Sequence, residues 1–262
     1  MDLQLRGKTA IVLAASKGLG KASARALAAE GADVVIGARD PKTLEEAAAE
    51  IRSLGGGRVI AVPMDVNDPA GMERIVAAAL QGYGRIDILV NNAGGPPFGP
   101  FDSFDDQAWQ AAFDLNLLSV VRCSRLVIPH MKKAGSGRII NIVSLSVKTS
   151  LENSVLSTSM RMGVVGMAKI LSNELGPFRI TVNNVAPGLL LTDRIKDTVA
   201  PQIAAGENLQ ELLAARAKTI PLRRIGEPGE LGALVAFLSS PLAGYITGTT
   251  IQVDGGAIQA PY

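Results

Sequence analysis

A stretch of small residues near the start of the chain lies between a short apolar run and a helical pattern. It reads Ala14-Ala15-Ser16-Lys17-Gly18-Leu19-Gly20. Small side chains let backbone N–H groups approach a pyrophosphate, and the N-terminus of the following helix favours its negative charge. The same glycines would also allow a strand and a helix to pack tightly, so the loop alone leaves both roles open.

Polar or small groups also follow the next three apolar runs. Arg39 follows Asp33–Ala38, Asp65-Val66 follows Arg58–Val62, and Asn91-Asn92-Ala93-Gly94 follows Ile86–Val90. Ligands of open parallel sheets bind outside the carboxyl ends of the strands. We therefore expect these groups to converge with the glycine-rich loop on one crevice.

The charge of Arg39 indicates which dinucleotide such a crevice would hold. A carboxylate after the second strand is typical of sites for NAD(H), whereas a guanidinium there can pair with the 2′-phosphate of NADP(H). Arg39, with Lys17 as a second cation, therefore favours NADP(H) over NAD(H). Asp40 beside it weakens this preference, and the alternative is a solvated surface arginine.

Seven short, partly β-branched apolar runs alternate with six longer helical patterns, and these elements must position the polar groups. The expected strands are Lys8–Leu13, Asp33–Ala38, Arg58–Val62, Ile86–Val90, Gly137–Ser144, Arg179–Val185 and Thr249–Val253. The expected helices are Gly18–Glu30, Pro41–Leu54, Pro69–Gln81, Asp105–Lys133, Leu156–Leu175 and Glu227–Ser239. This alternation predicts a doubly wound, Rossmann-type α/β fold, with a parallel sheet of about seven strands and helices on both faces. We expect one domain over residues 1–262, with a loop-like insertion on the substrate side at Leu189–Ile220.

Composition excludes several classes of function. Of the 262 residues, 47% are hydrophobic and the formal net charge is +2, without a basic block, so nucleic acid and membrane surfaces are not expected partners. The single cysteine and single histidine cannot form an internal disulfide or a histidine-based metal site. We expect a cytoplasmic protein with no bound metal.

The motifs, in their order along almost the whole chain, resemble the short-chain dehydrogenase/reductase family, most closely its ketoacyl-carrier-protein reductase type. The resemblance rests on Ser16–Gly20, Asn91–Gly94, Asn116, Ser144, Asn183–Gly188 and Thr192. It implies that Asn92, Ala93 and Gly94 lie beside the adenosine, that Asp65 and Val66 border the adenine, and that Pro187, Gly188 and Thr192 hold the nicotinamide. The family's usual Thr-Gly is Leu13-Ala14 here, and we expect the added methyl group not to prevent binding. The family also implies a homotetramer, with Val120, Val121, Val164, Val165 and Met167 as apolar contacts.

The catalytic set of the family departs from its usual form in this chain. Asn116 and Ser144 match, but the tyrosine and lysine that the family places three residues apart correspond to Ser157 and Arg161. Serine is much less acidic than a phenol, and arginine cannot exchange a proton, although it can stabilise an alkoxide. Lys148 is the only nearby lysine that could supply a proton, and the alternative is that it is solvated. Arg161 has its own alternatives, which are contact with the ribose hydroxyls or exposure to solvent.

These residues favour an NADP(H)-dependent oxidoreductase that passes a hydride between nicotinamide and a carbonyl or secondary alcohol, with atypical acid–base residues. A guanidinium in the pocket would also suit an anionic carbonyl substrate. The competing hypothesis is an NADP-binding sensor or assembly protein with weak or no activity, because the tyrosine and lysine are absent.

Overall fold

The computed structural model describes residues 1–197 and 199–259. All seven strands are parallel and form one sheet in the order β3-β2-β1-β4-β5-β6-β7. The order along the chain reverses between β1 and β4, so the loops that leave these two strands diverge and make room for a ligand. The strands are β1 (Thr9–Leu13), β2 (Asp33–Ala38), β3 (Val59–Pro63), β4 (Ile88–Asn91), β5 (Gly137–Ile142), β6 (Ile180–Pro187) and β7 (Thr250–Val253).

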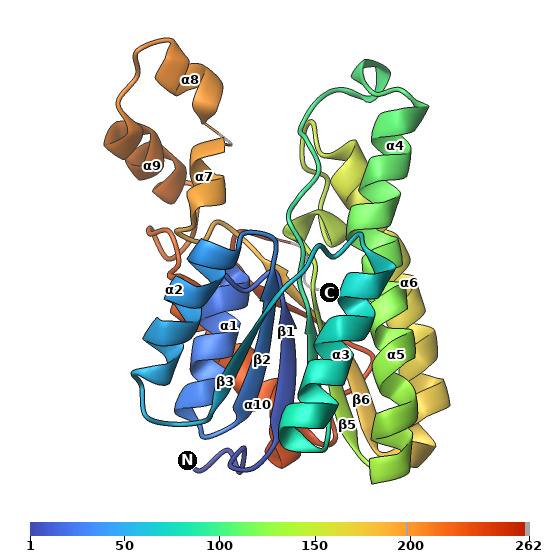
Figure 1. Ribbon diagram of the computed structural model, residues 1–262. Coiled ribbons are helices and arrows are strands. Elements are labelled where there is room, and N and C mark those ends of the chain that lie inside the picture. Colours follow the sequence, from blue (N-terminus) through green and yellow to red (C-terminus); the bar gives the residue numbers. More distant parts are fainter. Residues whose placement is uncertain (198, 260–262) are drawn as a thin grey trace.

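Helices cover both faces of the sheet, which confirms the predicted doubly wound fold (Figure 1). The helices on one face share an apolar core with the sheet; they are α1 (Gly18–Ala29), α2 (Pro41–Arg52) and α10 (Pro228–Ser239). The helices on the other face form a second core; they are α3 (Pro69–Tyr83), α5 (Ser119–Ala134) and α6 (Val155–Leu175). The buried strands are apolar on both sides because each face is covered.

A third, smaller apolar cluster lies where the later strands meet α5 and α6. It consists of Val120, Val143, Leu145, Val164 and Ala186. Two of the residues expected at a subunit contact, Val120 and Val164, are therefore buried within the protomer, and the expectation is wrong for both. Their β-branched side chains fill the space between the helices and the sheet instead.

A row of amides crosses the interior of the sheet at matched positions on neighbouring strands. Asn91 Nδ2 donates to Asn141 Oδ1 at 2.8 Å, and Asn141 Nδ2 donates to Asn184 Oδ1 at 3.0 Å. Asn184 Nδ2 donates in turn to Thr250 Oγ1 at 3.1 Å. The strand register makes this row possible, because these residues are direct neighbours on β4, β5, β6 and β7. These buried hydrogen bonds link four neighbouring strands and help to fix their relative positions.

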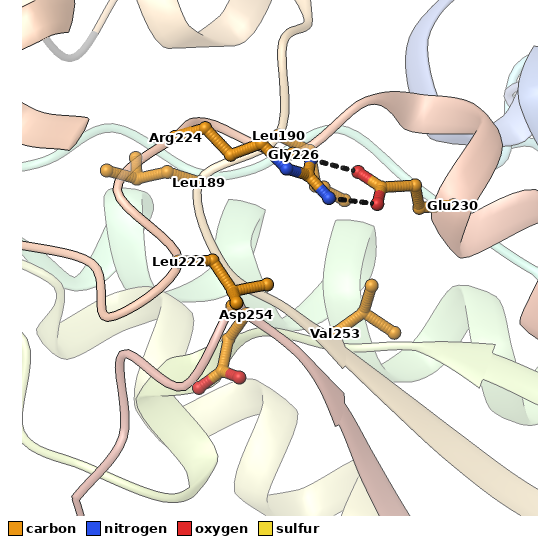
Figure 2. A pocket seen from close by; sticks show the side chains of 9 residues that line it. Leu189, Leu190, Leu222, Arg224, Gly226, Glu230, Val253 and Asp254 are labelled. Carbon is orange, nitrogen blue, oxygen red and sulfur yellow. Dashed lines mark hydrogen bonds and ion pairs between the residues drawn. The ribbon is translucent and has the colours of Figure 1, made fainter.

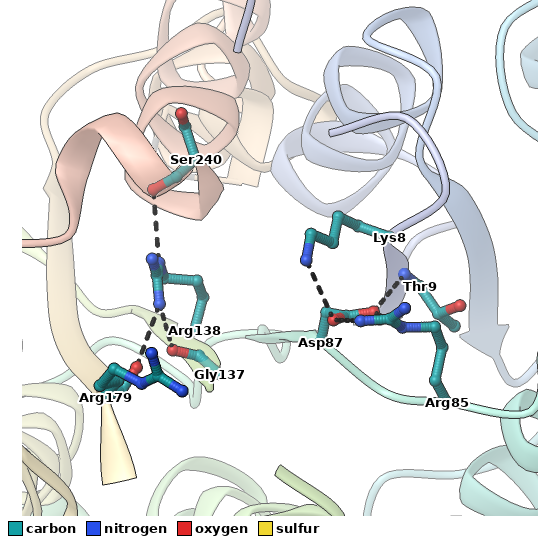
Figure 3. Close-up of polar contacts among 8 residues, drawn as sticks. All are labelled: Lys8, Thr9, Arg85, Asp87, Gly137, Arg138, Arg179 and Ser240. Atoms are coloured by element: carbon teal, nitrogen blue, oxygen red, sulfur yellow. Dashed lines mark hydrogen bonds and ion pairs between the residues drawn. The ribbon is translucent and has the colours of Figure 1, made fainter. Parts of the chain in front are cut away.

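The amino ends of the strands hold charged residues that are bonded within the protein (Figure 3). The Asp87 carboxylate is buried, accepts from the Thr9 amide at 2.9 Å and receives two bonds from Arg85 at 2.6 and 2.7 Å. Arg138 donates to the carbonyl oxygens of Gly137, Arg179 and Ser240. This edge is therefore a structural network, in which the charges are paired or satisfied by carbonyls.

The predicted helix Asp105–Lys133 is wrong as a single α-helix. The structure has α4 (Asp106–Phe113), a π-helical turn η2 (Asp114–Leu118) and then α5. Single π-turns inside helices are often found at functional sites because they turn one side chain away from its regular direction. The helical pattern of the sequence continues through this turn and does not reveal it.

The segment 189–220 is also less loop-like than expected. It contains three short helices: α7 (Asp193–Asp197), α8 (Ala200–Ala204) and α9 (Leu209–Ala217). Asn208 begins α9, because its Oδ1 accepts from the amide of Gln210 at 2.8 Å. In Figure 1 the three helices rise above the carboxyl ends of the strands on one side, and α4 rises on the other.

The two ends of this segment are joined to each other at the sheet. The Leu191 amide donates to the Gly226 carbonyl at 2.8 Å, and the Gly226 amide donates to Leu189 at 3.0 Å. Arg224 and Glu230 form a two-pronged ion pair beside this contact, as Figure 2 shows. The two ends of the segment that contains α7, α8 and α9 are therefore held together by backbone hydrogen bonds at the sheet.

The described part of the chain has no helix with the length and apolarity needed to cross a membrane. Nor do the described residues bring three histidine, cysteine, aspartate or glutamate side chains together as candidate metal ligands. Cys123 is buried in α5, and burial raises the pKa of its thiol to about 12. It acts as a small apolar side chain in the core.

Candidate active site

The glycine-rich loop connects β1 to α1 at the point where strand order reverses. At Gly20 a Cβ would lie 2.4 Å from the Ala14 carbonyl oxygen, so a larger residue would displace the loop. Gly18 has φ +57°, a left-handed conformation that glycine adopts without strain. Lys17 precedes α1 without capping it by its side chain, so the first N–H groups of α1 face the loop. The loop therefore fits the phosphates of a dinucleotide.

Ala14 is more than a small replacement for glycine. Its φ is +48°, which places an alanine in the left-handed region at a cost of about 1–2 kcal/mol. Asn92 supports this conformation, because its Nδ2 donates to the carbonyl oxygens of Ala14 at 3.2 Å and Leu13 at 3.3 Å. The same two bonds join the loop after β4 to the loop after β1.

The residues expected around the adenosine lie at the carboxyl ends of β2, β3 and β4. The Asp65 carboxylate accepts from the Asn67 amide at 2.9 Å, and Val66 beside it is buried. Ala93 is half-buried, and Gly94 is exposed with open space where a side chain would lie. These strand ends lie along one edge of the sheet in the order β3, β2, β1, β4, with the glycine-rich loop between those of β2 and β4.

The two candidate 2′-phosphate ligands are both exposed. Lys17 lies at the start of α1, and Arg39 follows β2. Neither side chain makes a hydrogen bond or ion pair with the residues that the structure describes. Asp40 is occupied with capping α2, where it accepts from the Thr43 amide at 2.7 Å. Asp40 therefore has a structural role that leaves the Arg39 charge free.

The residues expected beside the nicotinamide lie where β6 ends. The Gly188 amide donates to the Val253 carbonyl at 2.9 Å, and a Cβ on Gly188 would lie 2.8 Å from Cα of Asp254. Glycine is thus required here by close backbone packing. Pro187 is the last residue of β6. Thr192 lies opposite the glycine-rich loop, since a Cβ on Gly18 would be 3.6 Å from its Cγ2.

Asn116 lies in the π-helical turn η2 and is buried. Its Nδ2 donates to the Gly94 carbonyl at 2.8 Å, so the turn is joined to the loop after β4. Its Oδ1 is buried and has no hydrogen-bond partner in the described part of the chain. A buried acceptor without a partner can hold a water molecule or a ligand hydroxyl.

Ser144, Ser157 and Arg161 are carried by elements that pack together. Ser144 precedes the short turn η3 (Leu145–Val147), and its Oγ accepts from the Ser146 amide at 3.2 Å. Helix α6 packs against both η2 and η3, so Ser157 and Arg161 lie on the helix that faces Asn116 and Ser144. Arg161 Nη1 donates to Ser157 Oγ at 2.6 Å. The four candidate residues therefore belong to one group of elements.

Arg161 is buried, with 9% of its surface exposed, so the alternative of a solvent-facing arginine is wrong. Burial, with a smaller contribution from the charge of Arg194, lowers the pKa of its guanidinium to about 10. The guanidinium remains charged at neutral pH. Lys148 is half-buried just after η3, and its side chain has no hydrogen bond or ion pair with any described residue.

Arg194 is a residue that the sequence does not single out. It lies in α7, and its guanidinium donates to the carbonyl oxygens of Gly95 at 3.1 Å and Pro96 at 2.8 Å. It also stacks over the Phe98 ring, 5.2 Å from the centroid. Arg194 therefore connects the segment after β6 with the loop after β4, across the carboxyl end of the sheet. The sequence gives no sign of this contact, because Arg194 lies among other polar residues in a segment without a clear helical or strand pattern.

A glycine-rich loop, a helix N-terminus without a side-chain cap and polar side chains at the switch point are features of dinucleotide-binding proteins of the doubly wound class. A family model described as enoyl-(acyl carrier protein) reductase matches residues 13–257. The chain belongs to the short-chain dehydrogenase/reductase family, and the relatives that it matches are oxidoreductases.

Known proteins resemble the chain over almost its whole length. A 3-oxoacyl-[acyl-carrier-protein] reductase of Synechocystis sp. is 36% identical over 255 residues, which are 97% of this chain and 98% of the relative. The structure of L-sorbose reductase from Gluconobacter frateurii with NADPH and L-sorbose has a TM-score of 0.93 at 32% identity, covering 99% of this chain and 100% of that one. A 7α-hydroxysteroid dehydrogenase with NADH and 7-oxo glycochenodeoxycholic acid has a TM-score of 0.89 at 32% identity, covering 100% and 98%.

Proposed function

We propose that the protein is an NADP(H)-dependent oxidoreductase that interconverts a carbonyl compound and a secondary alcohol, with Ser157 and Arg161 in place of the family's tyrosine and lysine. The observation that carries this proposal is the buried Arg161 guanidinium, bonded to Ser157 on the helix that faces Ser144 and Asn116. A charge kept in that position stabilises negative charge on a reacting oxygen.

The cofactor would be held by residues at the ends of five strands, β1, β2, β3, β4 and β6. Ser16–Gly20 and the start of α1 would bind the pyrophosphate, and Arg39 with Lys17 would bind the 2′-phosphate. Asp65, Val66 and Asn92–Gly94 would border the adenosine, and Pro187, Gly188 and Thr192 the nicotinamide. When bound, the nicotinamide ring supplies or accepts the hydride. The choice of NADP(H) is supported by Lys17 and Arg39, two exposed cations that follow β1 and β2 and whose side chains make no hydrogen bond or ion pair with a described residue.

The residues around the substrate oxygen would bind that oxygen, stabilise its negative charge and allow its protonation. In the reductive direction the carbonyl carbon gains the hydride and its oxygen becomes an alkoxide. Ser144 donates a hydrogen bond to that oxygen, and the Arg161 guanidinium stabilises the negative charge. The proton comes from water or from Lys148, because the arginine keeps its protons. Asn116 would hold a water molecule through its unpartnered Oδ1.

The segment at 189–220 is proposed as the substrate-side insertion of a single NADP-binding domain over residues 1–262. Its helices stand above the strand ends, and Arg194 connects it to the opposite loop. This position supports a role in covering the substrate.

A homotetramer is proposed for the assembled protein. Support comes from α6, where Met162 and Ile170 are exposed apolar side chains on one face, with Val165 and Met167 half-buried nearby. Residues eight positions apart lie on the same side of a helix, so this face can pack against a second copy.

A second candidate, a catalytically weak NADP-binding protein, is favoured by one observation. The Ser157 hydroxyl accepts the bond from Arg161, and neither group has the acidity of the phenol that the family uses. Replacing both residues, Ser157→Tyr with Arg161→Lys, separates the candidates. A catalytically weak NADP-binding protein would gain carbonyl reductase activity, whereas an adapted enzyme would lose turnover of its own substrate.

The cofactor is tested by titrating the protein with NADPH and NADH and then following NADPH oxidation over a panel of carbonyl compounds. Arg39→Asp should weaken NADPH relative to NADH by about tenfold or more, since a charged hydrogen bond is lost. Lys133→Asp makes the same charge change on an exposed residue near the end of α5 and serves as the control. An unchanged preference in Arg39→Asp would refute the assignment of NADP(H).

A further inference from the structure

Arg161 carries a buried charge that the protein itself does not neutralise. Buried arginines are normally paired with carboxylates, because a guanidinium taken out of water loses its solvation. Across residues 1–197 and 199–259, Arg161 forms no ion pair, and its one hydrogen bond is to the neutral Ser157 hydroxyl. Four of the five N–H donors of the guanidinium therefore make no hydrogen bond with a described residue.

The charged side chain that acts on the Arg161 guanidinium is also positive. Arg194 reaches the same region from α7, and its charge opposes that of Arg161. Its own bonds go to the carbonyls of Gly95 and Pro96, which hold it in position without cancelling its charge. Two guanidiniums from different elements thus create a positive potential at the substrate end of the site.

A bound ribose could accept hydrogen bonds from Arg161 but would not neutralise the two guanidinium charges. Hydroxyl groups can accept hydrogen bonds from Arg161, but they are neutral and leave both positive charges without a counter-ion. An anion bound beside Arg161 would supply the missing charge, and a planar carboxylate also matches the fork of the guanidinium.

We propose that the substrate is a 2-oxo carboxylate whose carboxylate and adjacent carbonyl oxygen share the free donors of Arg161. This inference rests on the proposed function and specifies its substrate class. The two oxygens lie side by side in such a molecule, so one guanidinium can hold the carboxylate and stabilise the alkoxide. The hydride adds to the carbonyl carbon, the oxygen takes a proton from water, and a 2-hydroxy carboxylate leaves with its carboxylate unchanged.

The first test compares acids with their neutral esters in the full-length protein with NADPH. Pyruvate and 2-oxobutyrate should be reduced with kcat/KM about tenfold or more above that of their methyl esters, because the esters lose a charge-assisted bond. A second readout needs no turnover: oxamate, an unreactive analogue of pyruvate, should raise the Tm of the protein.

Variants of Arg161 show whether the selectivity belongs to this residue. Arg161→Met should abolish the oxamate-induced rise in Tm and the preference for acids over esters. Arg161→Lys should retain a reduced preference, because a lysine keeps the charge without the fork. Arg125→Met removes one exposed arginine from α5 and should behave as the wild type.

Three results separate failure of this inference from failure of the proposed function. If NADPH binds but esters are reduced as well as acids and oxamate has no effect, the substrate class is wrong. If Arg161→Met loses only NADPH affinity and keeps the acid preference, Arg161 binds the cofactor and the inference is overturned. If oxamate binds but neither NADPH nor NADH does, the proposed function is wrong and the anion site stands.

Discussion

Replacing Arg161 with methionine should make the ligand-free protein more stable. Burial, with the added charge of Arg194, lowers the pKa of the guanidinium from 12.5 to about 10. This decrease corresponds to about 3 kcal/mol against the charged form, at about 1.4 kcal/mol per pH unit. The group is charged in both states at pH 7, so the whole penalty is present there and is relieved only as the pH rises above about 10.

The net gain is smaller than the penalty because the substitution also removes a hydrogen bond. The bond from Arg161 to Ser157 contributes about 1 kcal/mol, and a flexible methionine fills most of the volume of the arginine stem. The free energy of unfolding should therefore rise by about 2 kcal/mol. Urea denaturation at pH 7, without cofactor or carboxylates in the buffer, measures this difference directly.

Arg138 provides a matched control on β5. It is half-buried, and its guanidinium donates to the carbonyls of Ser240, Gly137 and Arg179. Arg138→Met removes these hydrogen bonds and should lower the free energy of unfolding by about 2 kcal/mol. The opposite signs of the two variants are the critical result. A loss of 1 kcal/mol or more in Arg161→Met would mean that its charge is compensated within the protein, and the reasoning would fail.

Further substitutions test the surrounding structure. Gly20→Ala should abolish cofactor binding in a fluorescence titration, since its methyl group would meet a backbone oxygen at 2.4 Å. Ala14→Gly should raise the free energy of unfolding in urea by a few tenths of a kcal/mol, because relief of the left-handed strain exceeds the added chain entropy. The hydrogen bonds from Arg224 lower the pKa of Glu230 to about 2, and Arg224→Gln should return it towards 4.5 in an NMR titration. The stabilisation from this pair is full above about pH 4.5 and is lost as the pH falls to about 2. Ile170→Asp should yield a smaller assembly by light scattering if α6 lies between subunits; an unchanged mass would exclude that face.

The fold could be predicted because its signals are local. Seven apolar runs separated by helical patterns are enough to indicate a parallel sheet with two covered faces, and β2 spans the predicted residues. The errors lie where neighbouring residues do not decide the structure. The turn at Asp114–Leu118 continues the helical pattern of α4 and α5, so its π geometry is visible only once the chain is packed. The short helices after β6 lack a clear apolar side and depend on caps such as Asn208.

The candidate site could be predicted only in part. Residues that directly follow strands, such as Arg39 and Asn92, are found by reading the strand ends, and the structure brings those ends together. The position of Arg161 in the cleft is predicted from the resemblance and not from its local pattern, because it lies between two methionines on a helix with a weak pattern. Arg194 and its partner Gly95 are 99 positions apart, and neither belongs to a repeating pattern. Contacts of this kind follow from tertiary structure alone.

The paired backbones of Leu189–Leu191 and Gly226 have a consequence for how this protein can diversify. The ends of the intervening segment are fixed to each other, so its length and sequence can change without moving the strands beneath. Loop-closure entropy rises only slowly with length, which makes such changes inexpensive in stability. Exchanging residues 199–220 for those of a relative, with Thr192 and Arg194 kept, should therefore change substrate preference and leave the dinucleotide site intact. The paired backbones of Leu189–Leu191 and Gly226 therefore mark a position at which the substrate-side segment can be replaced while the sheet stays unchanged.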